Sequence, residues 1–245
     1  MSRVLITGST DGVGRAAAVS LLDDGHEVVV HARTRQRLSA VEDLTTRGAS
    51  AVVGDLAHLD QVQSIAEQAH HIGAVDAVIH NAGIIDGPSL LPVNVVAPYV
   101  LSALMGSPER LIYLSSSMHR GGDRNLARAD FSGTRKTVSY SDSKLFVTTL
   151  MAAVARRCTS VLAHAVDPGW VPTKMGGPSA SDDLALGHVT QAWLATTDDP
   201  EALVSGGYWH HEQTETPHPA VHDDDFQDQL VAALTEHTGI SLHHR

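Results

Sequence analysis

Cysteine is almost absent from this chain, which has one, Cys158, in 245 residues. One cysteine excludes an internal disulfide and any zinc site built from paired cysteines. Long apolar runs are absent too, because no stretch approaches the ~18 uninterrupted apolar residues that a membrane-spanning helix needs. Residues 1–3 lead directly into apolar residues 4–6, without the basic, apolar and cleavage regions of a signal peptide. We therefore expect a cytoplasmic protein with no membrane span.

Positive charge is scarce. Lysine and arginine together number 17 against 28 aspartates and glutamates, and the formal net charge is −11. Binding of nucleic acid without sequence preference depends on Lys and Arg side chains that neutralise phosphates. The balance of charge therefore argues against a nucleic-acid partner.

Histidine, by contrast, is abundant, with 16 in the chain. Four lie in one late segment, His210, His211, His218 and His222, which three aspartates follow. This segment is either a metal-ligand cluster or a solvated loop. Its spacing matches neither the i,i+4 histidines of a helical zinc protease nor the CxxC pairs of a structural zinc site. We favour the loop and expect no metal.

Short β-branched runs alternate with amphipathic stretches along the chain. We expect strands at residues 4–7, 28–31, 51–53, 77–80, 111–114 and 161–166. We expect helices at residues 13–22, 36–47, 59–71, 92–105, 140–157 and 226–238, the last closing one end of the sheet. Apolar strands joined by helical crossovers predict an α/β fold with a doubly wound parallel sheet of the Rossmann type. No repeat or linker divides residues 1–245, so we expect a single domain.

The first expected strand runs into a glycine-rich turn that opens a helix. Glycines accept positive φ angles and let backbone N–H groups approach a pyrophosphate at the helix N-terminus. A glycine-rich turn without any ligand is the alternative interpretation. The candidate cofactor-binding residues of this turn are Thr7, Gly8, Ser9, Thr10, Gly12, Val13 and Gly14.

The end of the second expected strand distinguishes NAD(H) from NADP(H). A carboxylate there would hold the ribose 2′-hydroxyl and repel a 2′-phosphate, but the sequence has Ala32 followed by Arg33. Because a guanidinium binds phosphate with two parallel hydrogen bonds, NADP(H) is favoured over NAD(H). The alternative is that Arg33, Arg35 and Arg37 form a solvated helix face. Asp11 is a departure, since its charge would oppose a 2′-phosphate.

Polar residues also follow the later strands. Asp55 and Leu56 follow the third strand, and Asn81, Ala82 and Gly83 follow the fourth. The fifth strand ends in three serines, residues 115–117. Farther on, Ser139 is a plausible N-cap for a helix on which Tyr140 and Lys144 stand four residues apart, so that both side chains emerge on one face.

Together these motifs resemble the short-chain dehydrogenase/reductase family over nearly the whole chain. The Thr-Gly-x3-Gly-x-Gly turn, Asn-Ala-Gly, Asn94, the serine after the fifth strand, Tyr-x3-Lys and Asp167-Pro168-Gly169 occur in the family's order. The long segment 118–139 and the tail around residues 205–219 are similar to the retinol-dehydrogenase-like branch. The resemblance does not imply retinol as the substrate.

The resemblance implies a role for each matching residue. Tyr140 is the general acid that protonates a carbonyl oxygen, and Ser116, the second serine of the family's pair, hydrogen-bonds that oxygen. Lys144 holds the nicotinamide ribose and lowers the pKa of the phenol, and Asn94 supports Lys144 through a water. The other implied cofactor contacts are Asp55 and Leu56 beside the adenine, Asn81, Ala82 and Gly83 in the cleft, and Pro168, Gly169, Val171 and Thr173 beside the nicotinamide.

One region departs from the family pattern. The segments from Asn81 to Asn94 and from Asn94 to Ser116 are shorter than the resemblance implies, so the fourth crossover helix must be cut back. In relatives this helix and the Tyr140 helix often form the oligomer interface. We therefore expect a monomer or homodimer rather than a tetramer, and the placement of Asn94 stays open.

The sequence as a whole predicts an oxidoreductase that transfers a hydride between NADP(H) and a carbonyl or alcohol of a small, lipophilic molecule. The main alternative is an NADP(H)-binding sensor or structural relative without turnover. An extended-type epimerase would need a different glycine spacing and a larger C-terminal domain. The residues Met118, His119, Trp170, Met175 and Trp209 are either an apolar pocket lining or part of the core.

Overall fold

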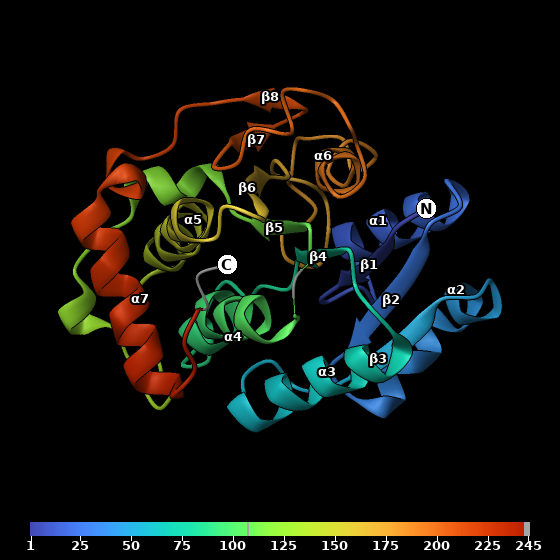
Figure 1. Cartoon of the computed structure of the whole chain (residues 1–245), viewed down its shortest axis with the longest axis horizontal. Helices are drawn as coiled ribbons and strands as arrows, with labels where there is room; N and C mark the ends of the chain where they lie inside the picture. The colour runs from blue at the N-terminus through green and yellow to red at the C-terminus, as the bar shows by residue number, and fades with distance from the viewer. Residues whose placement is uncertain (107, 243–245) are drawn as a thin grey trace.

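The computed structural model describes residues 1–106 and 108–242. Within these residues the chain forms one eight-stranded sheet in the order β3-β2-β1-β4-β5-β6-β7-β8 (Figure 1). All neighbouring strands are parallel except the last pair, β7 and β8. The strands are β1 (Arg3–Ile6), β2 (Glu27–Ala32), β3 (Ser50–Val53), β4 (Ala77–His80), β5 (Arg110–Leu114), β6 (Leu162–Asp167), β7 (Tyr208–His210) and β8 (Gln213–Thr214).

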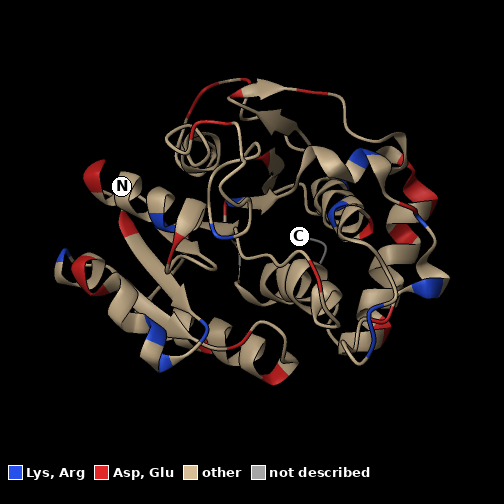
Figure 2. Cartoon of the chain, turned by 180° about the vertical axis from the view of Figure 1, so that it is seen from behind, with Lys and Arg blue, Asp and Glu red and all other residues tan. Residues whose placement is uncertain are grey.

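Helices cover both faces of the sheet. One apolar cluster joins the strands to α3 (Leu59–Ile72), α4 (Ala97–Leu104) and α5 (Tyr140–Arg157). The other joins them to α1 (Gly12–Asp23), α2 (Glu42–Thr46) and α6 (Val189–Leu194). Figure 2 shows most Lys, Arg, Asp and Glu residues on the helices and loops around the sheet. The predicted fold, one α/β domain with a doubly wound parallel sheet, is thus confirmed.

Strand β1 shows why the strand runs are apolar throughout. Leu5 faces the cluster of α3, α4 and α5, whereas Val4 and Ile6 face the opposite cluster. All three side chains have no exposed surface. Successive side chains of a strand point to opposite faces, so a strand covered on both sides must be apolar at every position.

Two expected helices differ from the structure. The stretch 36–47 divides into a 3-10 helix, η1 (Arg35–Val41), and the short α2. The stretch 92–105 begins with a π-helical turn, η2 (Pro92–Val96), and continues as α4. Helix α5 has the expected bounds, α1 is one residue longer than expected at each end, and α3 is one residue longer at its C-terminal end.

The sequence predicted that the C-terminal helix closes one end of the sheet, and this prediction was wrong for α7 (Asp224–Thr238). Helix α7 packs against the outer side of α5, where Phe226 and Phe146 meet edge to face at 6.1 Å between ring centroids. Its apolar residues join the core cluster of α5, so α5 is covered by the sheet on one side and by α7 on the other (Figure 1). Among the helices formed by the described residues, none is long and apolar enough to cross a membrane.

Candidate active site

The turn after β1 is held from the neighbouring strand β4. Asn81 Nδ2 donates to the carbonyl oxygens of Thr7 and Gly8, at 2.8 and 3.2 Å. The backbone N–H of Ala82 donates to the Thr7 hydroxyl at 3.0 Å. Gly8 has a φ of +65°, and a Cβ added there would lie 3.0 Å from the backbone of Ala82. Only glycine therefore fits a turn that approaches β4 this closely.

Ser9 and His31 lock this turn to β2 and β3. The Ser9 hydroxyl donates to Ile6 O at 2.9 Å and accepts from His31 N at 2.8 Å. His31 Nδ1 accepts from Gly8 N at 2.9 Å, so Nε2 carries the proton and donates to Gly54 O at 2.8 Å. Burial lowers the pKa of His31 and keeps the ring neutral. The buried Ser9 side chain therefore supports the turn instead of facing the cleft.

Asp11 stands at the N-cap of α1 but its side chain does not cap the helix. Its Oδ2 accepts from Lys174 Nζ at 2.7 Å and from Arg37 at 3.0 Å, and Arg37 also donates to Thr10 Oγ1 at 2.9 Å. These cations, Lys174 first, lower the pKa of Asp11. The negative charge of Asp11, which was expected to oppose a 2′-phosphate, is thus already neutralised by two cations. The first N–H groups of α1 lack a side-chain cap, and such groups attract an anion.

The loop after β6 reaches the same turn. A Cβ added to Gly12, whose φ is +56°, would lie 3.4 Å from Thr173 Cγ2. Val13 follows in α1, and Val171 is buried. The structure therefore brings the expected cofactor residues of the first turn and of the Pro168–Gly169 loop to one cleft.

Two further candidates follow the neighbouring strands β2 and β3. Arg33 is exposed immediately after β2. Asp55 follows β3, where its Oδ1 accepts from Ala57 N at 3.0 Å, and Leu56 is buried beside it. Both segments follow carboxyl ends of parallel strands, where such folds bind ligands.

Helix α5 begins at Tyr140 with a capping box. The Ser139 hydroxyl accepts from Asp142 N at 3.1 Å, and Asp142 Oδ2 accepts from Ser139 N at 2.7 Å. This double cap sets the first turn of the helix. Lys144 follows one turn later, with its Nζ 5.6 Å from the centroid of the Tyr140 ring. The helix thus presents a phenol and an ammonium side by side.

Lys144 lies deep in the site. Its side chain is buried, and its Nζ donates to Leu114 O at the end of β5 at 2.6 Å. Burial lowers its pKa to about 8, while the carboxylate of Asp167 acts in the opposite direction. No other hydrogen-bond acceptor for Nζ is found among the residues that the structure describes. An ammonium has three donors, so two are left for a ligand.

The phenol of Tyr140 has a raised pKa in the protein alone. Burial raises it to about 12, a hydrogen bond with the Ser116 side chain lowers it, and Asp167 raises it further. The resemblance implied that Lys144 lowers this pKa, but the protein alone shows no such effect. The reason is the order of titration: with a pKa of about 8, Lys144 has lost its proton before the phenol ionises.

The three serines after β5 have different environments. Ser115 is buried, and its hydroxyl shares a 2.6 Å hydrogen bond with Thr148 on α5. Ser117 is exposed. Ser116 lies between these extremes, with Oγ accepting from Met118 N at 3.3 Å and interacting with the Tyr140 phenol. Ser116 is therefore the serine that faces Tyr140.

Asn94 lies on the π turn η2, buried beside α5. Its side chain accepts from Ile84 N and donates to Ile84 O, both at 2.9 Å, and donates to Ser143 Oγ at 3.0 Å. A Cβ added to Gly83 would lie 3.5 Å from Asn94 Oδ1 and 3.6 Å from Lys144 Nζ. The shortened crossover thus still places Asn94 near Lys144, and its direct contacts fix the strand end that carries Gly83.

Comparison with known proteins identifies the family of this chain. The family model described as short chain dehydrogenase matches residues 2–102. Short-chain dehydrogenase chyC of Penicillium rubens is 37% identical over 99% of both chains. The chain belongs to the short-chain dehydrogenase family.

Other comparisons agree with this assignment. Human retinol dehydrogenase 14 is 29% identical to this short-chain dehydrogenase, covering 71% of this chain and 62% of that protein, which bears out the relationship to the retinol-dehydrogenase-like branch. A Mycobacterium paratuberculosis structure superposes with a TM-score of 0.80 at 22% identity, covering 99% of this chain and 95% of the other. A blue fluorescent protein in complex with NADPH has a TM-score of 0.70 at 23% identity, with coverage of 85% and 95%. These two structures share the fold.

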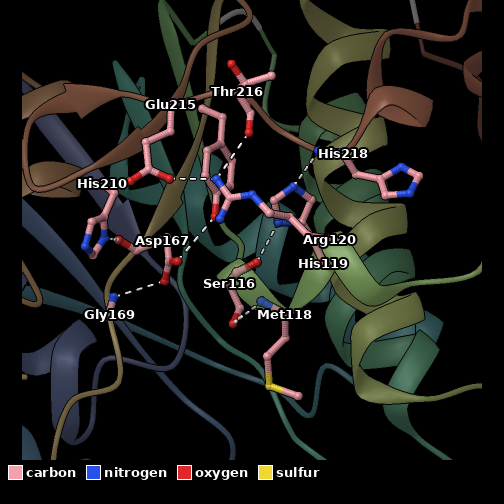
Figure 3. A network of polar contacts seen from close by, with 11 residues as sticks. Ser116, Met118, His119, Arg120, Asp167, Gly169, His210, Glu215, Thr216 and His218 are labelled. Carbon is pink, nitrogen blue, oxygen red and sulfur yellow. Dashed lines mark hydrogen bonds and ion pairs between the residues drawn. The ribbon is translucent and has the colours of Figure 1, made fainter. Parts of the chain in front are cut away.

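Asp167 has a place in a sequence motif of this short-chain dehydrogenase, but the sequence indicated no contact for its side chain. Asp167, at the end of β6, accepts from Gly169 N at 3.0 Å and from the Tyr208 hydroxyl at 3.3 Å (Figure 3). Lys174, the partner of Asp11, was missed by sequence reasoning. The proposed apolar lining divides: Trp209 is fully buried in the core beside α6 and His119 is fully buried, whereas Met118, Trp170 and Met175 are exposed.

The histidines of the late segment do not converge on one point. His210 Nδ1 bonds to Asp167 O at 3.2 Å, and the ring lies 3.9 Å from that of His211. His218 Nδ1 accepts from Ala220 N at 3.0 Å. In residues 1–106 and 108–242, no three His, Cys, Asp or Glu side chains are grouped as metal ligands would be.

Proposed function

We propose that this short-chain dehydrogenase transfers a hydride between NADP(H) and a carbonyl or alcohol of a small, lipophilic molecule. The observation that carries the proposal is the grouping of Tyr140, Lys144 and Ser116 at the carboxyl end of β5. A phenol, a buried ammonium with free donors and a hydroxyl stand together there. This group can hold a substrate oxygen and exchange a proton with it.

The residues of the cleft fit a dinucleotide. Gly8 and Gly12 have positive φ angles, and the uncapped N-terminus of α1 offers backbone N–H groups to the pyrophosphate. Lys144 has donors left for the nicotinamide ribose, next to Gly83, which has no side chain to fill the space. When bound, the nicotinamide supplies the hydride, and the protein supplies orientation and the proton.

Tyr140 donates its proton to the substrate oxygen while Ser116 holds that oxygen. A pKa of about 12 makes the phenol a donor that stays protonated until charge develops on the substrate. In the direction of alcohol oxidation the phenolate is needed. The oxidised nicotinamide and, below the Lys144 pKa of about 8, the Lys144 ammonium supply the positive charge that stabilises it. At the 5.6 Å between Nζ and the centroid of the phenol ring, a cation contributes about 3 kcal/mol at an effective dielectric of about 20. Asn94 keeps the end of β4 beside Lys144 in place.

The preference for NADP(H) rests on the end of β2. Ala32 is buried and carries no carboxylate, Arg33 is exposed next to it, and Arg37 is bonded to Thr10 in the glycine turn. The exposed guanidinium of Arg33 favours a 2′-phosphate, and Arg37 removes the opposing charge of Asp11. The NADPH complex of the blue fluorescent protein supports the same cofactor.

A lipophilic substrate is supported by the side chains near the site. Ile85, Met118, Trp170 and Met175 are 53%, 55%, 54% and 44% exposed, and they follow the carboxyl ends of β4, β5 and β6. Large exposed apolar side chains grouped around a catalytic site indicate an apolar ligand.

Oxidation of NADPH and of NADH in the presence of a panel of aldehydes, aryl ketones and quinones tests the proposal. We expect NADPH consumption with at least one carbonyl and a lower kcat/KM with NADH. Tight NADPH binding without consumption across the panel would favour a binding protein over an enzyme.

A further inference from the structure

The segment 215–218 is hydrogen-bonded to the turn that carries Ser116, although the two bonded residues are 99 positions apart in the sequence. The side chain of His119 makes this link (Figure 3). His119 lies in η3 (Ser117–Gly121), has no exposed surface and is adjacent in space to Tyr208, 4.7 Å away between ring centroids. His119 has no part in the proton transfer proposed for Tyr140, Ser116 and Lys144.

The two ring nitrogens of His119 have different partners. Nε2 accepts from the backbone N–H of His218 at 3.0 Å. Because a backbone N–H can only donate, Nε2 carries a lone pair and the proton of the neutral ring is on Nδ1. Nδ1 therefore donates to Ser116 O at 2.7 Å. Burial lowers the pKa of His119, which agrees with a neutral ring.

Further contacts hold the same two segments together. Arg120 pairs with Glu215 at 2.6 Å, donates to Thr216 O at 3.1 Å and lies over the Tyr208 ring at 5.4 Å. Tyr208 in turn donates to Asp167 at the end of β6. The strand end that carries Ser116 is thus bounded on one side by the C-terminal segment and on the other by the Asp167 loop.

We propose that His119 is a positioning residue for Ser116, with the C-terminal segment as its anchor. The ring donates to the Ser116 carbonyl oxygen, which also accepts from the His119 backbone N–H at 3.0 Å, and the His218 N–H holds the ring in this orientation. The backbone of Ser116 is thereby held so that its hydroxyl faces Tyr140. This inference rests on the proposed function, because it gives Ser116 a role in turnover.

Two amide variants, each of which keeps a polar atom in place of one ring nitrogen, separate positioning from packing. In His119→Asn the amide nitrogen is as many bonds from Cα as Nδ1, so the donor to Ser116 O can be kept while the acceptor for His218 N is lost. In His119→Gln the amide oxygen is as many bonds from Cα as Nε2, so the acceptor is kept and the Ser116 contact is lost. Both variants remove one buried hydrogen bond and the ring, so both should lose stability.

The matched control is His164. It is equally buried, with Nδ1 accepting from Trp209 Nε1 at 3.1 Å and Nε2 donating to Ala202 O at 2.9 Å, but it makes no contact with Ser116. His164→Gln and His164→Asn should therefore lower the melting temperature while leaving kcat unchanged. A role of His119 in stability alone would give the same result as this control.

The measurement is kcat and KM with NADPH and the carbonyl reduced fastest in the panel, with each variant held below its melting temperature. We expect His119→Gln to lose about 10- to 100-fold in kcat with KM changed little, because small misplacements of a catalytic group have such effects. His119→Asn should keep most of the activity. Equal kcat losses for the two variants, or none, would overturn the proposal.

A double-mutant cycle with Ser116→Ala distinguishes this proposal from the proposed function. If His119 acts through Ser116, adding His119→Gln to Ser116→Ala should cost less than about threefold more in kcat. Multiplicative losses would mean that His119 acts independently of Ser116. An undiminished kcat in Ser116→Ala alone would instead contradict the proposed role of Ser116.

A measurement without turnover checks the geometry. The 15N spectrum of histidine-labelled protein, with the His119 signals assigned by their loss in His119→Gln, reports which nitrogen is protonated. We expect the neutral Nδ1–H form at pH 7. A neutral Nε2–H form would reverse both hydrogen bonds and overturn the proposal even if no carbonyl of the panel were reduced.

Discussion

The ammonium of Lys144 donates to the carbonyl oxygen of Leu114 at 2.6 Å, which ties the buried cation of the proposed active site to the end of β5. One hydrogen bond to a neutral carbonyl is weak compensation for burying a charge, and the pKa of Lys144 falls from 10.5 to about 8 as a result. The residue is thus retained at a cost to stability. Such costs are common at functional sites.

Lys144→Met should therefore be more stable than the unmutated protein. A fall in pKa from 10.5 to about 8 corresponds to about 3 kcal/mol in the free energy of unfolding at pH 7. The Leu114 carbonyl left without its donor offsets part of this gain. Urea unfolding measures the difference, and turnover should be lost. A variant that is less stable at pH 7 would contradict the expected cost of the buried charge.

The same comparison has a defined pH dependence. Between about pH 8 and 10.5 the unfolded chain keeps the Lys144 proton that the folded chain has lost, so stability rises with pH in this window. The variant lacks this contribution. We expect its advantage over the unmutated protein to be full below pH 8 and to shrink towards pH 10.5. An advantage that stays constant across the window would assign it to packing.

Tyr140→Phe tests the proton donor while keeping the ring. We expect kcat to fall by about 10²- to 10⁴-fold, the range of general acid catalysis, with NADPH affinity unchanged. Single-turnover reduction by pre-bound NADPH measures the step directly. Ser117→Ala is the control, because this exposed neighbour of Ser116 should leave the rate unaffected. A Phe variant as fast as the unmutated protein would remove Tyr140 from the mechanism.

Arg33→Ala should weaken NADPH binding more than NADH binding. A hydrogen bond to a charged group contributes about 1.5–3 kcal/mol, or about 10- to 100-fold in Kd. Arg35→Ala removes the same charge two residues on and serves as the control. Asp11→Asn should change NADPH affinity less than about fivefold, because Lys174 and Arg37 already pair with this exposed carboxylate. Equal affinity of the unmutated protein for both cofactors would refute the preference.

Light scattering should give a mass of one or two chains of 26.0 kDa. The reason is the position of α7, which covers the outer side of α5 through Phe226, Leu230 and Leu234. A helix face covered within the chain is not available to a second copy. A stable tetramer would show that subunits associate through other surfaces.

The fold was largely predictable because its signals are local and strong. Helix α5 begins and ends at the expected residues, since Ser139 and Asp142 form a capping box that the N-cap expectation for Ser139 anticipated. The prediction of one α-helix over residues 36–47 was wrong because its first part is the tighter 3-10 helix η1. In η1 the Ser39 hydroxyl donates to Gln36 O, a local hydrogen bond that competes with α-helical geometry. Strands β7 and β8 have three and two residues, too few to show a period.

The site was predictable where side chains carry the chemistry and unpredictable where backbone atoms do. The spacing of Tyr140 and Lys144 is visible in the sequence, and the structure places both at the end of β5. The link from His119 to His218 runs through a backbone N–H, which every residue except proline has. No residue pattern could therefore have indicated it.

The long separation between His119 and His218 has a consequence for synthesis of the protein. The donor that anchors the His119 ring belongs to a residue 99 positions later in the chain. When the ribosome has added Lys144, the glycine turn and every proposed catalytic side chain already exist, but the anchor of Ser116 does not. A chain that stopped after β6 would therefore carry every proposed catalytic side chain, yet it would lack both the anchor of Ser116 and the apolar residues of α7 that complete the core around α5.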